Sequence, residues 1–190
     1  MKNEFENELK YIKDIRIKNS LKTMIDKLPD YFYEVPASST GKYHPNYALN
    51  KGGLVRHTKA AVRIARELLN NPSLNDFTSD EEDLIIMALT LHDGLKSGLV
   101  KSEYTLFEHP LLMSNYIKEN KKELELNDDQ IEFVTSVIET HMGPWTKNYK
   151  GEEVLSPPKT KEQKFVHMCD YLASRKFLEV NFDKDDNIIN

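Results

Sequence analysis

Four histidines and two aspartates in this chain are spaced in a way that predicts a metal site. They are His57, the adjacent pair His92 and Asp93, His109, His141 and Asp170. Neutral imidazole nitrogen and carboxylate oxygen are the ligands that proteins use for Mn, Fe, Co, Ni or Zn. Burying one polar group without a partner costs about 2–7 kcal/mol. A bound ion would remove that cost, so we expect these six residues to hold divalent metal.

The hydrophobic pattern places the metal-binding candidates on the inner faces of helices. His57 follows Leu54 by three residues and precedes Ala61 by four, which puts it on the core side of a helix. His141 follows Ile138 by three residues and is expected to face inward for the same reason. A single histidine on an apolar face is more often a hydrogen-bonded core residue than a ligand. The ordered set, and above all the adjacent His-Asp pair, favours metal binding.

Length and periodicity predict one all-α domain over residues 1–190, a helical bundle with the metal centre in its core. A single core of this size can bury roughly 70% of the surface of the unfolded chain. We expect an N-terminal helix within 1–29, a substrate-side loop over 30–52, core helices over 53–180 and a tail over 181–190. The loop contains several proline and glycine residues, and loops of such length are more often functional than idle.

Helix start and stop signals give approximate bounds for the individual helices. The expected helices span 4–28, 53–70, 79–92, 110–120, 127–141 and 160–180. The third is expected to begin with a capping box in which Ser79 pairs with Glu82. No segment reads as a long alternating strand.

Composition narrows the class of protein. The net charge is −5, and the only cysteine, Cys169, has no partner for an internal disulfide, which fits a reducing cytoplasm. No apolar run reaches the length of about 18 residues that a membrane span needs. The N-terminus is too acidic and polar for a signal peptide. The acidic balance argues against duplex nucleic acid as a partner, and a homo-oligomer remains open.

Positive charge gathers beside the first candidate ligand, because no Asp or Glu occurs between residues 35 and 66. Some of the basic residues there, such as Lys59, fit an ordinary solvated helix face. Lys42, Lys51 and Arg56 lie in or next to the preceding loop. We interpret these three as a rim that attracts phosphate.

The order His … His-Asp … His … His … Asp resembles the HD superfamily of metal-dependent phosphohydrolases, from about Pro36 to Arg175. The additional His109 and His141 are similar to the binuclear branch of that superfamily. The resemblance implies two divalent ions, of Mn, Fe, Co, Ni, Mg or Zn. One would be held by His57, His92, Asp93 and Asp170, and the other by Asp93, His109 and His141. Asp93 would bridge the two ions, since its two oxygens can serve both.

Further motifs extend the resemblance to residues that are expected to contact the substrate. His92-Asp93-Gly94-Leu95-Lys96 resembles the His-Asp-x-x-Lys motif, which implies catalytic roles for Asp93 and Lys96. The final-helix motif implies that Arg175 contacts phosphate, with a surface salt bridge as an equally good reading. His44, Lys51 and Arg56 complete the expected substrate-binding set. His167 fits no position of the superfamily and is interpreted as structural.

The entrance loop is similar to that of the HD domain in YhaM-type 3′-to-5′ exoribonucleases. The similarity rests on Pro36-Ala37, on the stretch from Tyr43 to Tyr47, and on Gly52 to Thr58. Pro45 replaces the second histidine of that loop. These enzymes also carry an N-terminal nucleic-acid-binding domain of the OB type, which the short helical N-terminus here is not expected to supply. The similarity therefore implies nucleotide or oligonucleotide chemistry more than processive RNA decay.

The leading hypothesis is a phosphohydrolase that uses metal-activated water on a nucleotide, a cyclic (di)nucleotide or a short oligonucleotide. Hydrolysis of dinucleoside polyphosphates or nucleoside monophosphates comes next. The alternative is a non-catalytic HD-fold module that binds or sequesters a nucleotide, and a purely structural protein is a weaker reading. Trp145, Tyr43 and Tyr47 could stack one or two bases, although Trp145 could equally pack against the turn that precedes it.

Overall fold

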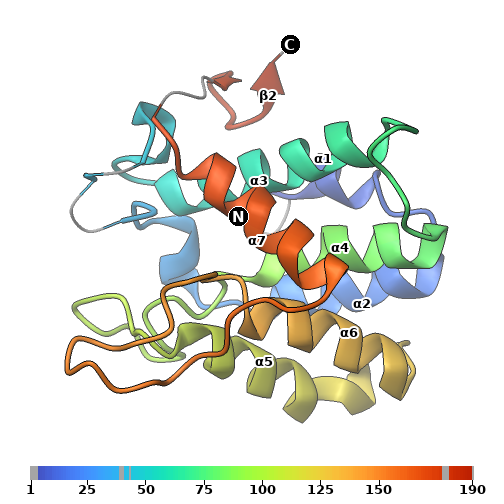
Figure 1. The fold of residues 1–190 in the computed structure, drawn as a ribbon. Coiled ribbons are helices and arrows are strands. Elements are labelled where there is room, and N and C mark those ends of the chain that lie inside the picture. Colours follow the sequence, from blue (N-terminus) through green and yellow to red (C-terminus); the bar gives the residue numbers. More distant parts are fainter. Residues whose placement is uncertain (1–3, 39–40, 43, 177–179, 190) are drawn as a thin grey trace.

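The computed structural model describes residues 4–38, 41–42, 44–176 and 180–189, and Figure 1 shows it as a bundle of helices. The α-helices are α1 (Glu6–Leu9), α2 (Ile15–Asp26), α3 (Gly53–Leu69), α4 (Ser79–Leu91), α5 (His109–Asn120), α6 (Asp128–Glu139) and α7 (Lys161–Ala173). Short 3-10 helices are η1 (Asp30–Tyr33), η2 (Asn46–Ala48) and η3 (Lys121–Glu123). Strands β1 (Asn181–Phe182) and β2 (Ile188–Ile189) form an antiparallel pair near the C-terminus.

Helix α4 forms the centre of the bundle. Every residue from 83 to 91 is buried, and a helix that is apolar on all sides belongs in a core. It packs against α2, α3, α6 and α7, while α3 pairs with α7 and α5 pairs with α6. The all-α fold class is confirmed. Within the described residues, no helix combines the length and the apolar character needed to cross a membrane.

Helix caps explain several boundaries. Asn127 and Gln130 form a capping box at the start of α6, as do Thr160 and Gln163 at the start of α7. The expected box at α4 was wrong by one residue. The Thr78 hydroxyl accepts from the Glu81 amide at 3.3 Å, and the Glu81 carboxylate accepts from the Thr78 amide at 2.7 Å. Both Ser79 and Thr78 satisfied the sequence pattern, and the reciprocal bonds select Thr78.

The prediction of a single N-terminal helix over 4–28 is wrong, because a non-helical segment separates α1 from α2. The buried carboxylate of Asp83, on the central helix, accepts from the backbone amides of Lys13 at 2.9 Å and Asp14 at 2.7 Å. Asp14 then caps α2 by accepting from the Arg16 amide at 2.7 Å. Two amides thus find a partner on α4 instead of within a continuous helix.

The C-terminal region also differs from expectation. Helix α7 was expected to continue to about residue 180, but it ends at Ala173. At this end the Ser174 amide donates to the Asp170 carbonyl at 3.1 Å. The tail over 181–190 contains the two short strands, joined by a turn. The Asp183 carboxylate stabilises this turn by accepting from the amides of Asp185 and Asn187, both at 2.9 Å.

The loop over 30–52 holds two 3-10 helices and closes onto the start of α3. The Ala37 amide donates to the Ala48 carbonyl at 3.0 Å, and the Leu54 amide donates to the Val35 carbonyl at 3.0 Å. Gly53 permits this closure, since a Cβ there would collide with the Ala48 carbonyl. The loop is therefore an ordered wall beside His57 in the part that the structure describes.

Candidate metal centre

Six side chains from five helical segments meet at one point in the bundle. They come from α3 (His57), the C-terminal end of α4 (His92 and Asp93), the start of α5 (His109), the residue that follows the cap of α6 (His141) and α7 (Asp170). The four histidines of this set and Asp93 are at most 2% exposed, and the Asp170 side chain is 18% exposed. The bundle thus brings together every residue that the sequence singled out as a metal ligand.

The two carboxylate oxygens of Asp93 face two different sets of groups. Its Oδ2 lies 3.5 Å from Nε2 of His92 and 3.8 Å from Nε2 of His57. Its Oδ1 lies 3.0 Å from Nε2 of His109 and 3.7 Å from Nε2 of His141. Asp93 therefore stands between the two halves of the centre, with one oxygen directed at each.

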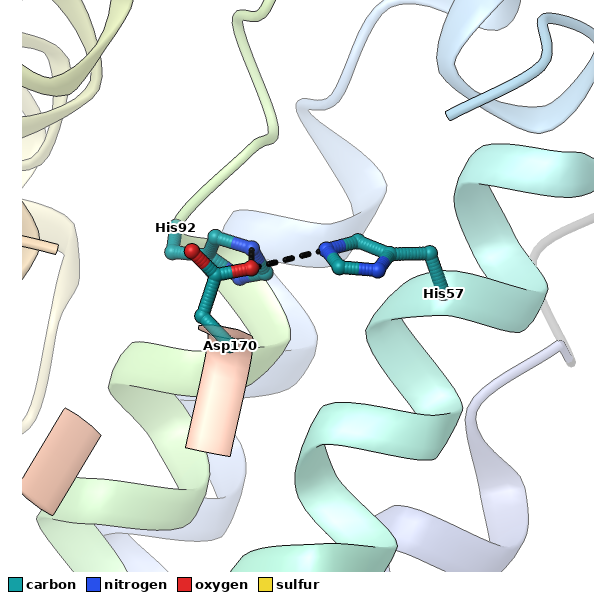
Figure 2. Close-up of side chains that lie close together, drawn as sticks. All are labelled: His57, His92 and Asp170. Atoms are coloured by element: carbon teal, nitrogen blue, oxygen red, sulfur yellow. Dashed lines mark hydrogen bonds and ion pairs between the residues drawn. The ribbon is translucent and has the colours of Figure 1, made fainter. Parts of the chain in front are cut away.

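Asp170 closes the first half of the centre. Figure 2 shows its carboxylate between His57 and His92, with Oδ1 2.9 Å from Nε2 of His57 and 3.4 Å from Nε2 of His92. The donor atoms of these three residues all lie within 4.8 Å of one another, as do those of His92, Asp93 and His141. His92 belongs to both groupings, so its nitrogen lies close to either half.

Main-chain oxygens fix the orientation of three of the imidazoles. Nδ1 of His92, His109 and His141 each lies 2.7 Å from a backbone carbonyl, those of Leu89, Leu106 and Ile138 respectively. A carbonyl only accepts, so each Nδ1 carries the proton and each Nε2 of a neutral ring presents a lone pair. This is the arrangement that proteins use to aim an imidazole at a metal ion.

Without a cation, these lone pairs are poorly satisfied. Nε2 of His109 and Nε2 of His141 face each other at 3.2 Å. Among the described residues, Nε2 of His92 and Oδ1 of Asp93 are buried and have no hydrogen bond of acceptable geometry. Two nitrogens that share one ion at about 2.1 Å each would lie about 3–3.4 Å apart. The donor set therefore fits divalent metal.

The electrostatics of the site favour ionised carboxylates. Burial alone would raise the pKa of Asp93, but the Lys96 ammonium and His92 outweigh it and hold that pKa well below its usual range. Burial likewise opposes ionisation of Asp170, yet the hydrogen bond from His57 and the close approach of His92 hold its pKa well below the usual range. The centre thus combines two carboxylates with nitrogen ligands.

The histidines respond to these charges in different ways. Burial, with the nearby His92 and His109, lowers the pKa of His141 to about 3. Burial would also lower the pKa of His92, but Asp93 and Asp170 outweigh it and raise that pKa. A proton on Nε2 of His92 would take the place in which a metal ion can sit, so protons and metal compete for this nitrogen.

A cavity of about 400 Å³ opens onto the centre. Four expected substrate or catalytic residues line it, namely His44, Asp93, Lys96 and Arg175. The Lys96 ammonium lies 2.5 Å from Oδ2 of Asp93. His44 packs edge-on against His57 with ring centroids 5.3 Å apart, and its pKa is lowered to about 3 by burial, with His57 adding to the effect.

The other two expected substrate residues do not reach this cavity. Lys51 is 80% exposed and its ammonium lies 3.7 Å from the Glu34 carboxylate. The Arg56 guanidinium donates to the Tyr47, Leu49 and Lys51 carbonyls and, at 2.8 Å, to the Asp186 carboxylate. The structure thus gives Arg56 the role of a clamp between the loop, α3 and the C-terminal turn, in place of the expected contact with phosphate.

Arg56→Ala is expected to lower the free energy of unfolding by about 2–3 kcal/mol, since it removes a charge-assisted hydrogen bond and leaves carbonyls without a donor. Lys51→Ala is the matched control from the same basic segment and should change stability by less than about 0.5 kcal/mol. Urea denaturation measures both. An Arg56→Ala protein with native stability and weaker binding of phosphate substrates would restore the sequence expectation.

Several cavity residues were not expected from the sequence. They include Thr105, Met142, His167, Tyr171 and Ser174. His167 was interpreted as structural, and its Nδ1 does donate to the His141 carbonyl at 2.7 Å, but its ring also lines the cavity. The four-residue spacing of His167 and Tyr171 was a readable signal, because it places both on one side of α7.

The tyrosines named as stacking candidates have other positions. The Tyr47 hydroxyl donates to the Ala173 carbonyl at 2.8 Å, and its ring contacts Phe182 with centroids 5.3 Å apart. Tyr43 lies outside the described residues. Of the three aromatic candidates, Trp145 is the one that lines the cavity in the part of the chain that is described.

Comparisons with known proteins agree with this geometry. The family model of the HD domain matches residues 47–175, a stretch that contains all six candidate ligands. The chain is also 29% identical over 164 residues to the 3'-5' exoribonuclease YhaM of Shouchella clausii (strain KSM-K16). That alignment covers 80% of this chain and 46% of the relative, so the chain spans less than half of the relative's length. No solved structure gives a significant match.

Proposed function

This chain belongs to the HD domain family, and from that premise we propose that it hydrolyses a phosphoester bond of a nucleotide, a cyclic (di)nucleotide or a short oligonucleotide with two divalent ions. The family match and the distant likeness to an exoribonuclease support a metal-dependent phosphohydrolase in general. The observation that carries the two-ion proposal is Asp93, whose two oxygens face separate sets of nitrogen atoms.

The proposed ligands divide around this carboxylate. His57, His92 and Asp170 would share the first ion with Asp93, and His109 and His141 would share the second with it. Divalent ions in such a site supply a water with a pKa lowered to about 7 and neutralise the oxygens of the phosphoryl group. The carboxylates are held in the ionised form that a metal ligand needs, and burial keeps His141 neutral, while at His92 the metal would displace the proton that Asp93 and Asp170 favour.

Cavity residues outside the ligand set would handle the substrate. The Lys96 ammonium is held by Asp93 at the floor of the cavity, where it can neutralise charge on a phosphoryl oxygen as the bond breaks. Arg175 at the rim can hold a second phosphate oxygen with its planar donors. His44 stays neutral, since its pKa is about 3, and can donate or accept a hydrogen bond without adding charge.

The test is a hydrolysis screen on the full chain, stripped with chelator and then resupplied with Mn²⁺, Mg²⁺, Co²⁺, Ni²⁺, Fe²⁺ or Zn²⁺. Substrates are cyclic nucleotides, short RNA and DNA, dinucleoside polyphosphates and monophosphates. We expect turnover that depends on added metal and is absent from the stripped protein. Metal-bound protein that binds nucleotides but cleaves none of these substrates would replace the enzyme with a nucleotide-binding module.

Short substrates are expected to be preferred, because a cavity of about 400 Å³ has the size of a small-molecule site. Long single strands need an extended basic groove with several stacking platforms, whereas this chain has a net charge of −5. Catalytic efficiency in a series from dinucleotide to roughly 30-mer should therefore rise little with length at fixed salt. Efficiency that climbs steeply along the series would instead indicate an exonuclease with a groove supplied by a partner or a second copy.

A further inference from the structure

An aromatic surface lies at the rim of the cavity and takes no part in the metal centre. The rings of Trp145 and Tyr171 lie nearly parallel, at 19°, with centroids 6.0 Å apart. Both residues line the cavity, yet Trp145 is 50% exposed and Tyr171 is 36% exposed. We call these two residues the aromatic shelf. Large exposed aromatic faces beside a polar centre are not explained by core packing.

The position of the aromatic shelf is fixed by the elements beneath it. Gly143 has a φ of +66°, and a Cβ there would collide with the His167 imidazole, so the turn after α6 packs closely onto α7. The His167 ring then contacts both shelf residues, with centroids 6.2 Å from Trp145 and 5.9 Å from Tyr171. His167 is itself held by its bond to the His141 carbonyl. The shelf is thus tied to the segment that carries a candidate metal ligand.

Positive charge adjoins the aromatic shelf. The Arg175 guanidinium lies 4.3 Å from the centre of the Tyr171 ring, and its nitrogens donate to the Ser174 hydroxyl at 2.8 and 3.1 Å. Arg175 and Lys96 line the same cavity as the shelf. One opening therefore presents a flat apolar surface, two cations and a centre that suits phosphate.

We infer that the aromatic shelf is the nucleobase subsite of this cavity, so that the ligand is a nucleotide unit whose base stacks on Trp145 while its phosphate lies toward Lys96 and the metal centre. This inference rests on the proposed function and names the part of the substrate that gives affinity. Stacking uses the π-face that every base has. Recognition by the shelf is therefore tolerant of base identity, and the larger purines bind more tightly than pyrimidines.

The chain itself supplies a reporter for this inference, because Trp145 is its only tryptophan. In chelator-treated protein, where hydrolysis is not supported, AMP and adenosine should quench its fluorescence. Ribose 5-phosphate and inorganic phosphate, which lack a base, should leave it unchanged. Equal quenching by ribose 5-phosphate and AMP would overturn the inference, since the signal would then follow phosphate rather than base.

Substitutions separate stacking from general damage to the fold. Tyr171→Ala should raise the Kd for AMP about tenfold, within the range for loss of one stacked base, while Tyr171→Phe keeps the ring and the native Kd. Calorimetry, which does not need the fluorophore, should give the same contrast between Trp145→Ala and Trp145→Phe. Thermal unfolding should stay close to native in all four. Native affinity for AMP in both alanine variants would overturn the assignment.

The inference and the proposed function fail in different ways. A protein that hydrolyses nothing in the screen but shows base-dependent quenching keeps the aromatic shelf and loses the enzyme. A protein that hydrolyses ribose 5-phosphate as well as AMP, with equal rates in Trp145→Ala, keeps the enzyme and loses the shelf.

Discussion

Asp93→Asn is expected to reduce metal-dependent hydrolysis by about a thousandfold or more, which corresponds to about 4 kcal/mol of transition-state stabilisation. The substitution keeps the shape of the side chain but removes the charge that faces both halves of the centre and the Lys96 ammonium. An amide is also a poorer ligand for these ions than a carboxylate. Elemental analysis of the metal-replete protein should show less than one ion per chain.

Asp83→Asn is the matched control for this experiment. Asp83, on α4, is also a buried aspartate, at 2% exposure, but it accepts from the amides of Lys13 and Asp14 and does not line the cavity. Its asparagine variant can lose stability, but the folded protein should keep the native metal content and turnover. Native metal content in Asp93→Asn would contradict the bridging role.

His141→Ala is expected to halve the metal content, from two ions per chain to one. His141 faces Oδ1 of Asp93, whereas Oδ2 and Asp170 remain with His57 and His92. Hydrolysis should fall by at least about a hundredfold, because even the loss of an outer hydrogen-bond partner of a metal ligand costs 10–100-fold. Equilibrium dialysis followed by elemental analysis measures the number of ions, and initial rates measure the loss of activity.

His44→Ala provides the comparison for His141→Ala. It removes another mostly buried cavity histidine with a pKa of about 3, but one outside both groups of candidate ligands among the described residues. Its metal content should stay at two ions while the KM for substrate rises. Only one ion in the native protein, under Mn- or Fe-replete conditions, would rule out the two-ion proposal.

The fold and the convergence of candidate ligands were predictable because their signals are local. His92 and Asp93 directly follow an apolar helix. The other candidate ligands lie on the inward faces of their helices, so packing of these helices brings all the side chains together. The capping boxes of α6 and α7 lie within four residues of sequence. Periodicity, spacing and caps are set by nearest neighbours, so a single sequence reveals them.

The errors arose where distant residues decide the outcome. Arg56 reads as a free cation beside a loop, but its carboxylate partner, Asp186, comes 130 residues later. The break between α1 and α2 depends on Asp83, which lies 70 residues beyond Lys13. No local pattern encodes such pairings. The aromatic shelf was missed in part for the same reason, since Trp145 and Tyr171 meet only when the turn after α6 packs on α7.

The carbonyl partners of the three oriented imidazoles have a consequence for how this site can change. Substituting the side chain of Leu89, Leu106 or Ile138 leaves the main-chain oxygen in place, so no exchange of amino acid deletes the bond itself. The backbone conformation therefore sets the ring orientation of His92, His109 and His141. Selection or engineering at neighbouring positions is then free to reshape the cavity for a new ligand, while the chemistry at its floor stays intact. A scan of alanine variants would overlook these oxygens altogether, although they orient three of the imidazoles in the centre.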